Sequence, residues 1–206
     1  MKPIAKPIVP GAVGAVLAAA LLAAACGPLV QIGGAGEAPD SLLTIRAGTG
    51  EPVAVTGKPL LVAMPSAPGA LRTLRIPVTT EATEIAYLPK ASWVEQPVVL
   101  FQRLLGEVVQ ARTGRPVVDE RNVDIGAAHR LSGRLLEFGL DARGAPQVRV
   151  RYDAILSSPG TGYVASRSFE ATRPASAETG PAVARALNEA ANEVAASVGD
   201  WIASQP

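Results

Sequence analysis

The side chains able to do acid–base or nucleophilic chemistry are few in this chain. His129 is the only histidine, so one chain cannot form a multi-histidine metal site or a histidine relay. We expect His129 at a surface or strand-edge position. A serine nucleophile on a tight turn needs a Gly-x-Ser-x-Gly pentapeptide, which does not occur here. The sequence therefore predicts no catalytic residue, no metal site and no enzymatic activity.

Two weaker motifs have simpler structural interpretations. Gly160-Thr161-Gly162-Tyr163-Val164-Ala165 matches a loose G-x-G-x-x-A pattern. A phosphate cradle needs a helix after the glycines. The following Ser166-Arg167-Ser168-Phe169 alternates like a strand, which favours a hairpin turn. Asp119, Glu120 and Asp124 lack the ligand spacing and central glycine of a calcium loop, so we expect a solvated connection.

The N-terminal segment has the organisation of an export signal. Lys2 and Lys6 are the only charges before Glu37, and residues 8–25 are apolar or neutral throughout. A basic start, an apolar middle and small residues at the end are typical of a secretory signal peptide. The alternative is an uncleaved membrane anchor, which Pro10, Gly11 and the many alanines make a weak span. We predict a signal peptide over residues 1–25.

Cys26 is the only cysteine and directly follows Ala23-Ala24-Ala25. This arrangement resembles the bacterial lipobox, which implies cleavage before Cys26 and attachment of a diacylglycerol and an N-acyl chain to it. The alternative for Cys26 is a small buried hydrophobic residue. Each buried CH₂ of an acyl chain contributes about 0.8 kcal/mol, so several chains anchor a protein durably. Gly27 follows Cys26 in place of Asp, which by analogy with enteric sorting favours the outer membrane. Residues 26–40 are rich in Gly, Ala and Pro and predict a flexible tether.

The charge balance excludes one broad class of partner. The chain has 19 Lys and Arg residues against 18 Asp and Glu residues. Cleavage before Cys26 removes two lysines, which leaves 17 − 18 = −1. A general nucleic-acid binder needs a basic excess to neutralise phosphates. We therefore expect no nucleic-acid partner.

The rest of the chain predicts one α/β domain over residues 41–204. Strand-like segments are expected at 42–46, 58–64, 71–78, 84–88 and 116–118. Residues 129–140, 147–157 and 163–172 predict an antiparallel meander, with Val148, Val150 and Tyr152 pointing inward. The fold class is thus a mixed, largely antiparallel sheet packed by two main amphipathic helices.

The first helix is expected from a Ser92-x-x-Glu95 capping box or from Pro97, and it ends at Thr113-Gly114. The second is expected over residues 181–203. Trp93 and Trp201 fall on the apolar stripes of these helices. Core packing is the default for both, and their large amphipathic rings make them candidate partner contacts.

The order of these segments resembles that of the ABC-type transport auxiliary lipoprotein family. The resemblance rests on the lipobox, the tether, residues 59–65, the stretch 87–93 leading to Pro97, residues 130–138, and residues 167–171 before an alanine-rich terminal helix ending in Trp201. Ser41-Leu42-Leu43 departs from the Tyr-x-Leu start of many members.

This resemblance implies a non-enzymatic periplasmic lipoprotein anchored in the outer membrane. It implies a docking adaptor that accompanies an MCE-domain protein and an ABC permease and ATPase in lipid traffic between membranes, with assembly into homo-oligomers as an open possibility. The alternative hypothesis is a periplasmic lipid carrier with its own acyl-binding cavity. A third, a secreted hydrolase, is disfavoured by the missing nucleophile motif.

Overall fold

The computed structural model describes residues 41–48, 54–118, 120 and 127–205. All of them lie within one compact unit, Ala38–Pro206. The elements in chain order are β1 (Leu60–Val62), the 3₁₀ turn η1 (Gly69–Leu71), β2 (Pro77–Thr79), β3 (Ile85–Tyr87), α2 (Pro97–Thr113), β4 (Val117–Val118), β5 (His129–Asp141), β6 (Gln147–Ser158), β7 (Tyr163–Pro174) and α3 (Gly180–Ala203).

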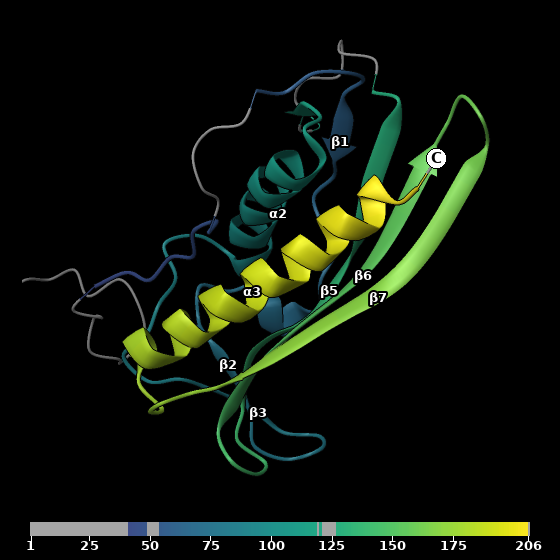
Figure 1. The fold of residues 1–206 in the computed structure, drawn as a ribbon. Helices are drawn as coiled ribbons and strands as arrows, with labels where there is room; N and C mark the ends of the chain where they lie inside the picture. Colours follow the sequence, from purple (N-terminus) through teal and green to yellow (C-terminus); the bar gives the residue numbers. More distant parts are fainter. Residues whose placement is uncertain (1–40, 49–53, 119, 121–126, 206) are drawn as a thin grey trace, which may run out of the picture. The chain divides into compact units, whose positions relative to one another are not determined.

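The strands form one seven-stranded mixed sheet (Figure 1). Its largest part is the antiparallel meander of β5, β6 and β7, which confirms the predicted hairpins. Two short strands pair in parallel with the other edge of β5: β1 with its first residues and β2 with its last. β4 and β3 complete the sheet beside β1 and β2. β5 is therefore the central strand that connects both ends of the fold.

Both helices pack on the same face of the sheet (Figure 1). Two ring pairs join them to the meander. Phe101 of α2 lies 5.3 Å from the ring of Tyr152 on β6. Trp201 of α3 lies 5.7 Å from Phe169 on β7. Val148, Val150 and Tyr152 are fully buried, as the alternation predicted. The core thus lies between the helices and this inner face of the sheet.

The start of the first helix differs from one of the two sequence expectations. α2 begins at Pro97 with Gln96 as its N-cap, and no side chain caps it. The capping box predicted at Ser92 and Glu95 is therefore wrong. Proline is favoured in the first turn of a helix because its missing N–H has no intrahelical acceptor there. Gly114 ends α2 with a φ of 65°, as expected for a C-terminal glycine.

Two predicted strands are also wrong. Residues 42–46 form only an isolated bridge, between Leu43 and Trp93. The segment 71–78 is divided between η1 and β2, and the residues between them are bends. In the two segments Ile45, Leu71 and Ile76 are buried outside any strand, whereas Leu42 and Leu74 are exposed. Apolar residues that are buried in irregular backbone give a pattern that resembles a short strand.

The remaining elements agree with the sequence expectations to within a few residues. β3, β4 and the terminal helix lie where they were predicted, whereas the 3₁₀ turn η1 was not predicted. Gly160 and Gly162 are in the β6–β7 hairpin turn, as expected. The buried face of α3 contains the predicted stripe from Val183 to Ile202. Neither helix in the described ranges is long and apolar enough to cross a membrane.

Candidate functional site

Both tryptophans, the candidate partner contacts, are buried in the structure. Trp93 precedes α2 and is fully buried, with its ring 5.8 Å from Phe138. Its predicted place on the helix is wrong. Trp201 does lie on α3, and only 8% of it is exposed. Both rings are therefore occupied by packing within the domain. Cys26 lies outside the described residues.

The acidic group near residue 120 is only partly described. Glu120 forms an exposed ion pair with Arg130 of β5, whereas Asp119 and Asp124 lie outside the described residues. Across the described ranges, no three His, Cys, Asp or Glu side chains are arranged to hold a metal ion.

Charged side chains gather on the face of the meander that points away from the helices, here called the outer face. Because strand side chains alternate, the neighbours of buried Val148, Val150 and Tyr152 point to this face. They are two arginines and an aspartate on β6. Opposite them are Arg134, Glu137 and Gly139 on β5 and acidic or hydroxyl side chains on β7. The polar residues of the outer face include Arg134, Glu137, Asp141, Arg149, Arg151, Asp153, Ser168 and Glu170.

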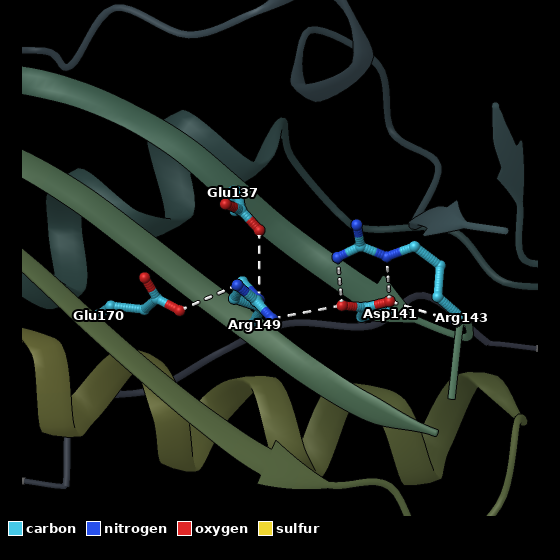
Figure 2. A network of polar contacts seen from close by, with 5 residues as sticks. All are labelled: Glu137, Asp141, Arg143, Arg149 and Glu170. Carbon is cyan, nitrogen blue, oxygen red and sulfur yellow. Dashed lines mark hydrogen bonds and ion pairs between the residues drawn. The ribbon is translucent and has the colours of Figure 1, made fainter. Parts of the chain in front are cut away.

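Arg149 is at the centre of a charged network on this face. The network, which we call the Arg149 cluster, consists of Arg149, Glu137, Asp141, Glu170 and Arg143. Figure 2 shows its guanidinium between three carboxylates from neighbouring strands: Nε is 3.4 Å from Glu137, Nη2 is 3.3 Å from Asp141, and Nη1 is 3.1 Å from Glu170. Each carboxylate approaches from a different side, and this spacing limits their mutual repulsion. The Arg149 side chain is 27% exposed, so solvent screens these pairs only in part.

Asp141 is the most strongly held acid of the cluster. Arg143 binds it with two side-chain hydrogen bonds, Nε to Oδ1 at 2.8 Å and Nη2 to Oδ2 at 2.6 Å. These bonds, and then the Arg143 amide and the charges of Arg143 and Arg149, lower the pKa of Asp141 to about 2, although burial opposes the shift. The carboxylate is therefore ionised at any physiological pH.

A groove of about 360 Å³ lies beside the Arg149 cluster. Its lining includes the apolar residues Leu71, Ile85 and Leu136 and the charged residues Asp141 and Arg143. Leu136 is at the irregular position where the β5–β6 register shifts between Leu135 and Glu137. The bulge therefore coincides with an apolar residue of the groove lining, next to the charged Arg149 cluster.

A second polar site lies at the opposite end of β5. His129 opens this central strand and is half-buried, so the expected edge-strand position is wrong, whereas the alternative of a surface position agrees with its partial exposure. Its Nδ1 is 2.6 Å from Oγ of Ser158, the last residue of β6. Burial, and then the charges of Arg115 and Lys58, lower the pKa of His129. The imidazole is therefore neutral at pH 7.

Sequence reasoning missed both sites for identifiable reasons. The alternation of β6 showed that Arg149 and Arg151 share a face, but pairing with Glu137 and Glu170 depends on strand register, which no local pattern states. Likewise, Ser158 and His129 are 29 positions apart and meet because β5 and β6 are antiparallel.

The sequence model of the family described as the ABC-type transport auxiliary lipoprotein component matches residues 41–199 of this chain. This range covers α2, the whole sheet and most of α3. The chain belongs to this family. No curated protein sequence matches it significantly.

Solved structures agree on the fold of this auxiliary lipoprotein domain. A DUF330-family protein from Xanthomonas campestris is similar with a TM-score of 0.64 and 24% identity, over 79% of this chain and 93% of that one. An uncharacterized protein is similar with a TM-score of 0.62 and 14% identity, over 77% and 99%. At these identities the likeness shows the fold alone.

Proposed function

We propose that this family member is a docking adaptor of an MCE/ABC-type intermembrane lipid transport system. It is held on the periplasmic face of the outer membrane by acyl chains on Cys26. The observation that carries the proposal is the family match over nearly the whole folded unit. The lipobox-like sequence before Cys26 adds the means of anchoring.

The surface proposed for docking to the MCE-domain protein is the outer face. The inner face is covered by α2 and α3, whereas no described element covers the outer-face charges on β6 and β7. The Arg149 cluster fixes its charges in position before a partner arrives, which reduces the entropy lost on binding. Complementary charges set specificity and association rate more than affinity.

Cell fractionation tests the anchoring part of the proposal. Cys26→Ala should move the protein from the outer-membrane fraction to the soluble periplasmic fraction and weaken the permeability barrier, while the circular dichroism spectrum stays unchanged. Retention of the Cys26→Ala protein in the outer membrane would contradict the lipid anchor.

A pair of charge reversals tests the docking part. Arg134→Glu changes the outer face, where this side chain is 64% exposed, and Arg185→Glu is the matched control on the exposed side of α3. Co-purification of the MCE-domain protein should fall for Arg134→Glu only. Equal binding by both variants would exclude this part of the outer face as the contact.

A further inference from the structure

The pocket beside His129 has features that the adaptor function does not use. It has a volume of about 760 Å³ and lies where β5 begins and β6 turns into β7. Its described lining includes Lys58, Ala127, Ala128, His129, Ser158 and Tyr163, together with the turn between Ser158 and Tyr163. We call it the Lys58 pocket.

Two of the cations near this pocket, Lys58 and Arg115, form no ion pair with a described carboxylate, whereas Arg130 pairs with Glu120. Lys58 lines the pocket, and Arg115 is close enough that both cations disfavour protonation of His129. No carboxylate occurs in the described lining, and neither Lys58 nor Arg115 forms an ion pair within the described part of the chain. By contrast, Arg143 and Arg149 both contact carboxylates. Like charges at this distance repel each other, and a bound anion would relieve the repulsion between the two cations.

The hydrogen-bond donors at the pocket also suit an anion. When Ser158 donates its hydroxyl to Nδ1 of His129, the imidazole proton is on Nε2, which is then a donor. Gly160 and Gly162 contribute backbone amides with no acceptor among the described residues, in a turn whose missing side chains permit close approach. Ala127, Ala128 and the Tyr163 ring add apolar wall.

We propose that the Lys58 pocket binds an organic oxyanion, a phosphate monoester with a short apolar body, through Lys58 and the Ser158-bound His129. The apolar body lies against Ala127, Ala128 and Tyr163. The ammonium of Lys58 supplies the charge–charge contact that lysines make with phosphates. This site is at the far end of β5 from the Arg149 cluster, and it holds whether or not the outer face docks a partner.

His129 is the only histidine, so its ring resonances report on this pocket alone. The experiment titrates the full chain, purified in a nonionic detergent without a polyhistidine tag, with hexyl phosphate, inorganic phosphate and hexanol. Hexyl phosphate should shift the His129 ring signals and raise the pKa of His129, because an adjacent anion favours the imidazolium. Hexanol should do neither.

Two matched lysine variants test whether Lys58 supplies the positive charge that binds the phosphate. Lys58→Gln should weaken the binding of hexyl phosphate about tenfold, as expected for one lost charge-assisted contact. Lys90→Gln removes the only other lysine after Cys26 and should leave binding unchanged. Tighter binding of hexyl phosphate than of inorganic phosphate supports the amphiphilic ligand, and equal binding supports an oxyanion site filled by free phosphate.

Three results would overturn the proposal. They are unchanged His129 signals at millimolar hexyl phosphate, an equal response to hexanol, and equal weakening by Lys58→Gln and Lys90→Gln. Membrane fractionation and co-purification do not depend on these outcomes, so failure here is distinguishable from failure of the adaptor function.

Discussion

The phenol oxygen of Tyr152 lies where a side chain on Gly133 would begin. A Cβ at position 133 would be 2.7 Å from Tyr152 Oη and 2.2 Å from the carbonyl oxygen of Asp153. The absence of a side chain on β5 thus lets the Tyr152 hydroxyl donate to the Ser132 carbonyl at 3.0 Å. Tyr152 in turn packs against Phe101 of α2, so this contact between two strands also positions the helix.

Gly133→Ala should therefore destabilise the domain strongly. The added methyl meets backbone, which cannot move aside without breaking the β5–β6 ladder, and overpacking of this kind costs about 1–3 kcal/mol or more. Urea unfolding followed by circular dichroism measures the effect. Gly144→Ala is the control, because nothing lies within 4 Å of a Cβ there. Equal midpoints for the two variants would contradict the close-packing argument.

Replacing Arg149 should lower the free energy of unfolding more than replacing an exposed arginine. Arg149→Ala leaves Glu137, Asp141 and Glu170 without their shared cation, and uncompensated like charges destabilise the fold. We expect a loss of about 2 kcal/mol in the free energy of unfolding, since charge-assisted hydrogen bonds contribute roughly 1.5–3 kcal/mol.

Arg112→Ala is the matched control for Arg149. Its ion pair with Asp200 is largely exposed, with side chains 50% and 62% accessible, so we expect a loss below about 1 kcal/mol. Chemical denaturation of both proteins in the same buffer makes the comparison. A larger loss for Arg112→Ala would show that the Arg149 cluster contributes little.

Asp141 should make the protein sensitive to acid. Its pKa is lowered to about 2 in the folded state, so its contribution to stability is present above its ordinary value near 3.8 and is lost as pH falls from that value through 2. Asp141→Asn removes the carboxylate and should flatten this part of the stability–pH curve. Thermal melts between pH 2 and pH 7, on the order of one pH unit apart, test it against the parent protein. Identical slopes for both proteins would be inconsistent with the Arg143 contact.

His129 should give a second, separate pH effect. Burial and the nearby cations lower its pKa, so the folded state favours the neutral ring. The folding free energy from this residue is fully present above the ordinary value of 6.5 and is lost progressively as pH falls below it. His129→Gln should remove this decline below the ordinary value of 6.5, as thermal melts of both proteins at falling pH would show. A decline unchanged in the variant would assign it to other groups.

The sequence alone predicts the elements whose side chains repeat with a fixed period. The alternation from Val148 to Tyr152 predicted the face of β6 correctly, and the stripe from Val183 to Ile202 predicted α3. The order of short segments along the chain also predicted the family, which the match over residues 41–199 confirms. These are local or serial properties, and they need no knowledge of the fold.

Tertiary structure decided everything that depends on which strand lies beside which. Trp93 lies in the core before α2, because the helix begins only at Pro97 and Trp93 forms a bridge with Leu43. The antiparallel registers of β5, β6 and β7 place three carboxylates around Arg149 and place Ser158 beside His129. A shift of one residue in either register would remove these contacts. Side-chain periodicity shows which face a residue points to, whereas the residue it meets there depends on long-range strand pairing.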